Sequence, residues 1–177
     1  MGGVLPGCRP AGAARRDASR GAGGRGSEAA GARARARSRS VILLDAYALV
    51  ALLVRGPAEP QVRALLHAGD LAMPTINVAE ALYVAQRRGM PRELARAGVD
   101  PLVEGPVAPI SLTLELAREA AEIRAEHYDR RSRPLSLADC VLLASGAPGN
   151  GVATADPDVL AVAPLVGLKP IALPPER

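Results

Sequence analysis

Four acidic residues of this 177-residue chain lie in apolar stretches, whereas most of the others alternate with arginine in helix-like segments. The four are Asp45, Glu80, Asp139 and Asp156. Three of them are the only charged residues of their stretches, which are residues 41–54, 71–86 and 134–155. The fourth directly follows the apolar run GVATA. Because an unpaired carboxylate costs several kcal/mol to bury, each of them must find a partner or lose its charge.

Helix capping explains each of these carboxylates taken singly. The two that follow strand-like runs can cap the next helix, and a proline follows Asp156 as it often follows an N-cap. Glu80 stands three residues after Asn77, which is the spacing of a capping box. Asp139 stands at the same spacing from Ser136. An N-cap contributes about 1 kcal/mol, which is less than full burial of a carboxylate costs, so capping explains the four together less well.

Short apolar runs alternate along the chain with segments of helical pattern. The runs that predict strands are residues 41–45, 71–74, 107–110, 151–156 and 168–174. The segments that predict helices are residues 46–55, 59–68, 75–89, 91–105, 111–131, 135–145 and 156–163. We expect the helix of 91–105 to break before Pro101. Alternation of this kind favours an α/β fold, with a parallel sheet covered by helices on both faces.

This alternation brings the four carboxylates toward one edge of the sheet. Two of them follow strands, at the carboxyl edge where open α/β sheets build their sites. The other two lie in the first turns of apolar helices that must pack against the same sheet. Four carboxylates at one edge repel one another strongly unless a cation neutralises them. Oxygen ligands suit Mg²⁺ or Mn²⁺ rather than zinc, and a pair of such ions is suited to phosphodiester hydrolysis.

Four segments in order, VILLDAYALVALL, INVAEAL, LSLADCVLLA and GVATADPDVLAVA, resemble the motifs of PIN-domain ribonucleases. More narrowly, they are similar to the VapC-type toxins of bacterial type II toxin–antitoxin modules. The resemblance covers residues 41–177 and none of residues 1–40. It implies a PIN-like nuclease domain, which is a three-layer α/β/α sandwich around a small, mainly parallel sheet. Proteins of this kind are usually dimeric.

The resemblance also implies roles for individual residues. The four carboxylates match the family's catalytic acidic tetrad, which holds Mg²⁺ or Mn²⁺ and activates a water to cut RNA. Thr154 matches a supporting Ser or Thr two residues before the last acid. Asp158 stands where the family often has one more carboxylate, although a solvated helix start explains it equally well. The usual partner is a small antitoxin protein whose C-terminal segment covers the active site.

Two other functions fit the same residues. A PIN-like fold that only binds RNA or protein would keep the architecture without catalysis, although the intact tetrad disfavours it. A metal-dependent phosphohydrolase acting on small molecules ranks lower. Its haloacid-dehalogenase type needs a second Asp two residues after the first, where this chain has Tyr47.

Other residues that could do chemistry have simpler explanations. Arg130, Arg131 and Arg133 lie just before the Asp139 segment, where they either contact RNA phosphates or form a solvated loop. The two histidines lack companions at ligand spacing, so positions on the surface or at helix ends are expected. Cys140 is expected to be a small buried residue.

Composition excludes several classes of protein. The chain has no Phe or Trp, so its core must be aliphatic. No apolar run reaches the roughly 18 residues of a membrane span, and no membrane association is expected. The two cysteines lie far apart in the sequence, which suggests neither a disulfide framework nor a zinc site. A reducing cytoplasm is therefore the expected location.

Residues 1–40 hold nine Arg against two acidic residues, a net charge of +7, and almost no large apolar side chains. Such a segment cannot bury enough apolar area to offset chain entropy, so we expect it to be disordered. One interpretation is a basic arm that binds nucleic acid. The other is that translation begins near Val41, where the first strand-like run starts, and that the segment is not native.

Overall fold

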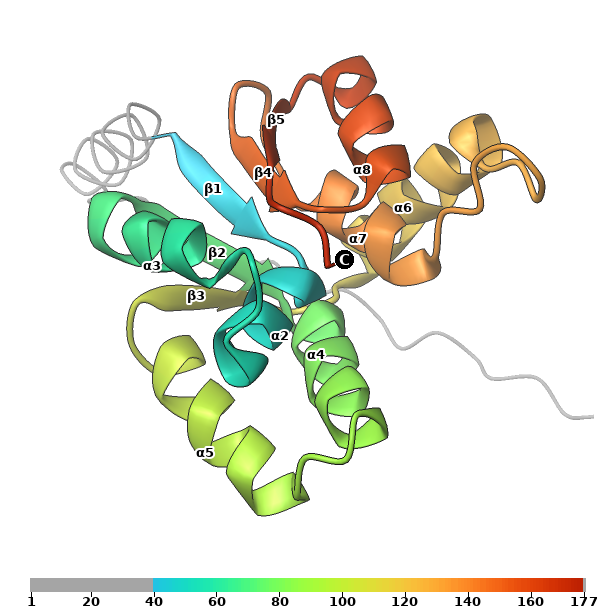
Figure 1. Ribbon diagram of the computed structural model, residues 1–177. Coiled ribbons are helices and arrows are strands. Elements are labelled where there is room, and N and C mark those ends of the chain that lie inside the picture. The colour runs from blue at the N-terminus through green and yellow to red at the C-terminus, as the bar shows by residue number, and fades with distance from the viewer. Residues whose placement is uncertain (1–39, 177) are drawn as a thin grey trace, which may run out of the picture. The chain divides into compact units, whose positions relative to one another are not determined.

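Five short strands form one parallel sheet in residues 40–176, the part of the chain that the structure, a computed structural model, describes. They are β1 (Val41–Leu44), β2 (Asp70–Pro74), β3 (Val107–Ile110), β4 (Gly151–Thr154) and β5 (Lys169–Ala172). Their order across the sheet is β3-β2-β1-β4-β5, and every neighbouring pair is parallel (Figure 1). The two expectations for the N-terminal segment, disorder and a late start of translation, fall on residues outside this part.

β1 is the central strand of the sheet. The chain adds β2 and β3 on one side of β1, and it then crosses to the other side, where it adds β4 and β5. In the register, Leu43 of β1 pairs with Ala72 of β2 and with Val152 of β4. The strand order therefore reverses between β1 and β4. In open parallel sheets, a crevice forms beyond the carboxyl ends of the strands at such a point.

Helices connect the strands, as the sequence pattern predicts. They are α2 (Ala46–Val54), α3 (Glu59–Ala68), α4 (Thr75–Arg87), α5 (Arg92–Val103), α6 (Leu114–His127), α7 (Leu137–Ala144), α8 (Pro157–Val162) and the 3-10 helix η1 (Ala163–Val166). Every predicted strand and helix is present in this order, and η1 is an element that the sequence did not predict. Among residues 40–176, no helix is both long enough and apolar enough to cross a membrane.

The strands alternate their side chains between two apolar cores, one on each face of the sheet. Leu44 of β1 and Ala153 of β4 belong to the core shared with α2, α3 and α5. The preceding residues, Leu43 and Val152, belong to the core shared with α6, α7 and α8 (Figure 1). This is the period-two alternation of a sheet covered on both faces. It confirms the α/β/α sandwich, with a sheet that is parallel throughout.

The helix that was expected to break before Pro101 does not break there, and that prediction was wrong. α5 runs from Arg92 to Val103 with Pro101 inside it. The proline is exposed, whereas Leu102 and Val103 beyond it pack against the core of α2 and α3. Burial of these two side chains outweighs the loss of one backbone donor.

The amphipathic helix expected over 111–131 is shorter at both ends. α6 begins at Leu114 because the Thr113 hydroxyl accepts a hydrogen bond from the Leu116 amide at 3.2 Å. It ends at His127, and the chain continues into a turn closed by backbone hydrogen bonds between Asp129 and Arg133. This turn leads to the start of α7.

Candidate active site

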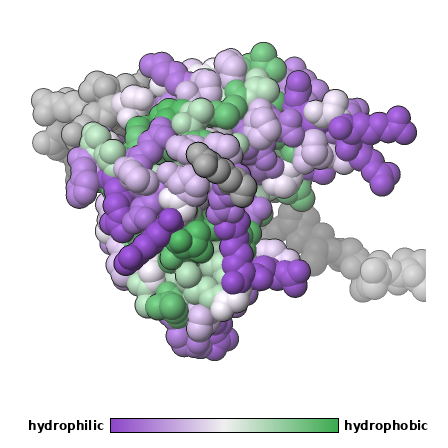
Figure 2. Space-filling model, in the orientation of Figure 1, coloured by the Kyte–Doolittle hydropathy of each residue, from purple (hydrophilic) through white to green (hydrophobic). Residues whose placement is uncertain are grey.

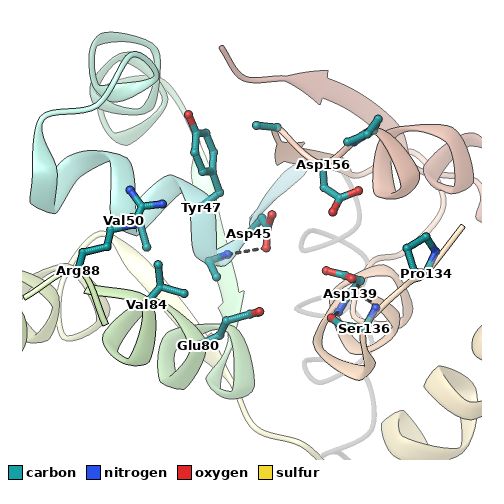
Figure 3. Close-up of a pocket in the computed structure, with 13 residues that line it drawn as sticks. Asp45, Tyr47, Val50, Glu80, Val84, Arg88, Pro134, Ser136, Asp139 and Asp156 are labelled. Atoms are coloured by element: carbon teal, nitrogen blue, oxygen red, sulfur yellow. Dashed lines mark hydrogen bonds between the residues drawn. The ribbon is translucent and has the colours of Figure 1, made fainter. Parts of the chain in front are cut away.

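All four carboxylates singled out in the sequence line one pocket of about 570 Å³ (Figure 3). Asp45 directly follows β1, and Asp156 follows β4 after one residue. Glu80 lies on α4, and Asp139 lies in the first turn of α7. The other lining residues are Ala46, Tyr47, Val50, Val84, Arg88, Pro134, Ser136, Ala155 and Pro157. The fold therefore places the four acids, which are far apart in sequence, at the carboxyl edge of the sheet.

A pair of hydrogen bonds through Thr154 links the Asp45 carboxylate to the Asp156 backbone amide at the strand ends. Because β1 and β4 are neighbours, Asp45 meets Thr154 across the edge of the sheet. The Thr154 hydroxyl donates to Asp45 Oδ2 at 2.6 Å and accepts from the Asp156 amide at 2.9 Å. Thr154 is fully buried, so no water competes for its hydroxyl. The threonine thus holds Asp45 and Asp156 in a defined relation.

Asp45 is the most deeply buried of the four carboxylates, with 6% of its surface exposed. Its Oδ1 accepts from the Ala46 amide at 2.6 Å, which confirms Asp45 as the N-cap of α2. The Asn77 side-chain amide donates to the same oxygen at 3.4 Å. Donors from β4, α2 and α4 therefore fix both oxygens of this carboxylate.

Asn77 is a residue of the site whose role the sequence did not reveal. The capping box of Asn77 and Glu80 was wrong, because α4 begins at Thr75, directly after Pro74, and Asn77 is already its third residue. Asn77 is fully buried, and its amide points to Asp45 instead. Its Oδ1 has no hydrogen-bond partner among the described residues. The available signal was its spacing of three from Glu80, which places both side chains on one helix face.

Asp139 caps a helix and also lines the pocket. Its Oδ2 accepts from the Ser136 amide at 2.6 Å, and its own amide donates to the Ser136 hydroxyl at 3.0 Å. This confirms the capping box at the start of α7. The carboxylate also lines the pocket and faces Asp156 (Figure 3). The cap fixes the orientation of Asp139, and no described residue donates a hydrogen bond to its Oδ1.

Asp156 and Glu80 complete the set in different ways. Asp156 Oδ1 accepts from the amides of Asp158 and Val159, so Asp156 caps α8 as predicted. Asp158 is half-buried and does not line the pocket. Glu80 is also half-buried, and its carboxylate points into the pocket without a hydrogen bond from the described residues (Figure 3). Glu80 is therefore the least constrained of the four.

Burial and mutual repulsion raise the pKa values of three of these carboxyls. Burial is the largest cause at Asp45, whose pKa rises from 3.8 to about 6 despite the hydrogen bond from Thr154. Burial, followed by repulsion from Asp45, raises the pKa of Glu80. Burial also raises the pKa of Asp139 against the opposing hydrogen bonds from Ser136. The pocket thus gathers negative charge that a cation would stabilise.

The free oxygens of the pocket fit a hard divalent cation. Asp139 Oδ1, Asp156 Oδ2 and both oxygens of Glu80 accept no hydrogen bond from the described residues. Within residues 40–176, no group of three or more His, Cys, Asp or Glu side chains is gathered closely enough to hold an ion as it stands. Mg²⁺ keeps several waters and is bound through one or two carboxylates, so spaced carboxylates around an open pocket suit it. An all-oxygen set suits Mg²⁺ or Mn²⁺ better than zinc.

A family model of the PIN domain matches residues 42–164, a range that contains all four carboxylates. The chain belongs to the PIN-domain family. The resemblance identified from the four sequence segments is therefore confirmed, and the match begins within β1 and ends in η1.

Solved structures of bacterial toxins share the fold of this PIN domain. The toxin VapC20 of Mycobacterium tuberculosis, which cleaves the sarcin–ricin loop, is 21% identical, with a TM-score of 0.56 over 68% of this chain and 94% of its own. VapBC2 of Rickettsia felis, bound to a DNA fragment from its promoter, is 13% identical, with a TM-score of 0.56 over 76% and 99%. A toxin–antitoxin complex from Klebsiella pneumoniae is 18% identical, with a TM-score of 0.51 over 72% and 94%. No curated protein matches the chain.

The three arginines predicted to contact RNA lie beside the pocket of this PIN domain rather than in it. Arg130, Arg131 and Arg133 belong to the turn between α6 and α7, and none of them lines the pocket. The turn leads directly into Pro134 and Ser136, which do line it. Contact with RNA by these arginines therefore stays a prediction.

Arg88 is the basic residue that does line the pocket, and sequence reasoning missed it. It is the C-cap of α4 and follows Glu80 and Val84 of that helix at intervals of four, and this spacing was the available signal. Cys140 is buried, as predicted, and His127 is the last residue of α6. Neither of them lines the pocket.

Proposed function

We propose that this PIN domain is a metal-dependent endoribonuclease, which hydrolyses phosphodiester bonds of RNA, and that it acts as the toxin of a toxin–antitoxin pair. The convergence of four carboxylates in one pocket carries the proposal. Three of them have raised pKa values, so the folded protein gathers charge at this place against its own stability. Carboxyls perturbed in this way and grouped in a cleft are typical of a functional site.

The carboxylates have distinct parts in binding a divalent ion. Glu80, Asp139 and Asp156 each have at least one carboxylate oxygen that accepts no hydrogen bond from the described residues and can bind Mg²⁺ or Mn²⁺. Both oxygens of Asp45 accept hydrogen bonds, which hold the carboxylate in place, and a remaining lone pair can bind the ion. When bound, such an ion lowers the pKa of a water ligand and neutralises charge on the phosphate oxygens. The binding of these ions by these residues is the step on which the reaction depends.

The surrounding residues keep this set in order. Thr154 orients Asp45 and holds the Asp156 backbone, so the ends of β1 and β4 cannot separate without breaking the buried hydrogen bond between Thr154 and Asp45. Ser136 holds one oxygen of Asp139 and leaves the other directed to the pocket. Fixed ligands of this kind reduce the reorganisation that catalysis would otherwise require.

RNA and a protein antitoxin are the partners that we propose. Structures of the same fold include a toxin that cleaves the sarcin–ricin loop and two assemblies of toxin with antitoxin. An apolar groove of about 490 Å³, lined by residues of α2, α3 and α5, offers a surface for a protein partner. Figure 2 shows apolar residues gathered over α2 and α5 within a hydrophilic surface. A cytoplasmic homodimer is the proposed form of the protein.

Cleavage of RNA by purified variants tests the activity. We expect RNA cleavage that requires Mg²⁺ or Mn²⁺ and that is lost in Asp45→Asn and in Asp139→Asn, because each change removes a charged ligand. Asp100→Asn is a matched control, since Asp100 lies on α5 outside the pocket. Circular dichroism is used to check that each variant folds. Undiminished cleavage in either pocket variant would show that the site is wrongly assigned.

Binding of the metal alone separates the two alternative functions from this one. Isothermal titration of the full chain with Mn²⁺ is expected to show binding that Asp139→Asn weakens strongly. Absence of Mn²⁺ binding would favour a module that only binds RNA or protein. Hydrolysis of small phosphate esters without RNA cleavage would favour a small-molecule phosphohydrolase.

A further inference from the structure

The carboxylate pocket continues along α4 to a basic side chain at its far end. Glu80 and Val84 lie on one face of α4, Arg88 follows at the same interval of four as the C-cap of the helix, and all three line the pocket. Tyr47 and Val50 of α2 line the same stretch (Figure 3). The pocket therefore passes from four acids over an apolar wall to a guanidinium. Arg88 is the one Lys or Arg among its lining residues in the described part of the chain.

The C-terminal residues of the described chain contact side chains at this end of the pocket. After β5, the Leu173 amide donates to the Thr154 carbonyl at 2.8 Å, and the Leu173 side chain is buried. The Tyr47 hydroxyl then donates to the Pro174 carbonyl at 2.6 Å. Two residues later, the Glu176 carboxylate forms an ion pair with Arg88. The Glu176 carboxylate is thus paired with Arg88, which is the one basic residue lining the pocket among residues 40–176.

This ion pair is open to exchange with an external anion. The side chains of Arg88 and Glu176 remain 39% and 33% exposed, and such solvent-exposed pairs contribute about 0–1 kcal/mol. A guanidinium binds carboxylate and phosphate groups with the same planar set of donors. The Glu176 carboxylate therefore marks the position that a phosphate group can take.

We infer that Arg88 binds a phosphate that flanks the scissile phosphate of single-stranded RNA, and that Glu176 competes for this position in the free protein. The inference rests on the proposed function. It adds a second phosphate-binding position, at Arg88, and a side chain of the same protein, Glu176, that competes with the phosphate for this position. A polyanion entering a pocket of four carboxylates is repelled even when a cation neutralises part of their charge. Arg88 is the group in the pocket that favours its entry.

The dimensions of the pocket fit a strand that runs from the carboxylates to Arg88. Arg88, the C-cap of α4, stands eight positions after Glu80, which corresponds to a rise of about 12 Å along the helix. Tyr47, Val50 and Val84 lie in between and give an apolar wall for a nucleoside, with the Tyr47 ring available for stacking.

Binding of a short single-stranded RNA to the full chain tests the inference. Fluorescence anisotropy is measured in the Asp139→Asn background with EDTA, so that the RNA stays intact and no variant differs in bound metal, and over a range of salt concentrations. Arg88→Gln is expected to weaken binding by about fivefold or more and to reduce the slope of log Kobs against log salt by about 0.7. Glu176→Gln is expected to tighten binding by about two- to fivefold, the equivalent of a weak exposed ion pair.

The double variant and two matched controls make the result specific. Because Glu176 acts through Arg88, Arg88→Gln/Glu176→Gln is expected to bind RNA no better than Arg88→Gln alone. Arg87→Gln removes the same charge from the neighbouring exposed residue of α4, which does not line the pocket. Glu93→Gln removes a carboxylate from another exposed ion pair, that with Arg92. Neither control is expected to change the affinity by more than about 1.5-fold.

Three results would overturn the inference. The first is weakening by Arg87→Gln equal to that by Arg88→Gln, which shows a general effect of charge. The second is unchanged binding in Arg88→Gln. The third is tighter binding by Glu176→Gln when Arg88 is already absent. Failure of the proposed function is recognised separately, by absence of RNA cleavage in the unaltered protein with Mn²⁺.

Discussion

Replacement of Asp45 by Asn tests the electrostatics of the pocket through stability rather than activity. The pKa of Asp45 rises from 3.8 to about 6 on folding, chiefly because the carboxyl is buried. At neutral pH, the folded protein must therefore hold this group ionised at a cost of about 3 kcal/mol relative to the unfolded chain. Asn carries no charge, but it loses the charged acceptor for the Thr154 hydroxyl. We expect Asp45→Asn to raise the free energy of unfolding of the metal-free protein by about 1–3 kcal/mol at neutral pH.

The same pKa shift fixes the sign of the pH dependence. Between about pH 4 and pH 6, the folded protein keeps a proton on Asp45 that the unfolded chain has released. The free energy of unfolding therefore falls as the pH rises through this window, and the contribution of Asp45 levels off above it. Asp45→Asn removes this part of the fall. The raised pKa values of Glu80 and Asp139 act in the same direction and remain in the variant.

Urea-induced unfolding in EDTA, repeated from about pH 4 to about pH 8, measures both effects. Asp100→Asn on α5 is the matched control and is expected to follow the unaltered protein. Addition of Mn²⁺ is expected to reverse the order of stability, because the ion stabilises the protein that has the Asp45 carboxylate. Two results would show that burial of Asp45 has no such cost. The first is a lower free energy of unfolding for Asp45→Asn than for the unaltered protein at neutral pH without metal. The second is an equal loss of stability by Asp45→Asn and the unaltered protein between about pH 4 and pH 6.

Three further substitutions have defined outcomes. Thr154→Val removes both hydrogen bonds of the threonine hydroxyl and is expected to lower the rate of RNA cleavage about tenfold or more. Thr154→Ser keeps the hydroxyl and is expected to keep most of the rate. Equal cleavage rates of these two variants would contradict this expectation. Ser136→Ala removes the cap of α7 and is expected to lower the free energy of unfolding by about 1 kcal/mol in urea titrations; no change would show that the cap contributes little. Asn77→Leu fills the same buried volume but removes the amide that donates to Asp45, and it is expected to weaken Mn²⁺ binding measured by calorimetry. Unchanged affinity would show that Asn77 contributes only to packing.

Local sequence determined a large part of this protein. The alternation of apolar runs and helical patterns predicted every strand and α-helix of the described residues in order, because each pattern reflects which side chains an element must bury. The caps by Asp45, Asp156 and the pair of Ser136 and Asp139 were also readable, because a cap depends on residues at most three positions apart. The isolation of the four carboxylates and their motif order identified the residues of the pocket.

Contacts between distant segments decided the rest. The start of α4 follows from Pro74 ending β2 inside the sheet, so Asn77 became a buried donor to Asp45 instead of a cap. The continuation of α5 past Pro101 follows from the burial of the residues beyond it. Neither outcome is encoded in the pattern of the segment itself, because the packing partner lies elsewhere in the chain.

The pocket shows the same division. Sequence alone gave the acids and their proposed chemistry, whereas the order β3-β2-β1-β4-β5 set β1 beside β4 and brought Thr154 between Asp45 and Asp156. Sequence pointed to the arginines before α7 as the basic residues of the site. The fold instead placed Arg88 in the pocket, where it forms an ion pair with Glu176. Ion pairs between residues 88 positions apart leave no local pattern, since they depend only on where the folded chain brings two side chains together.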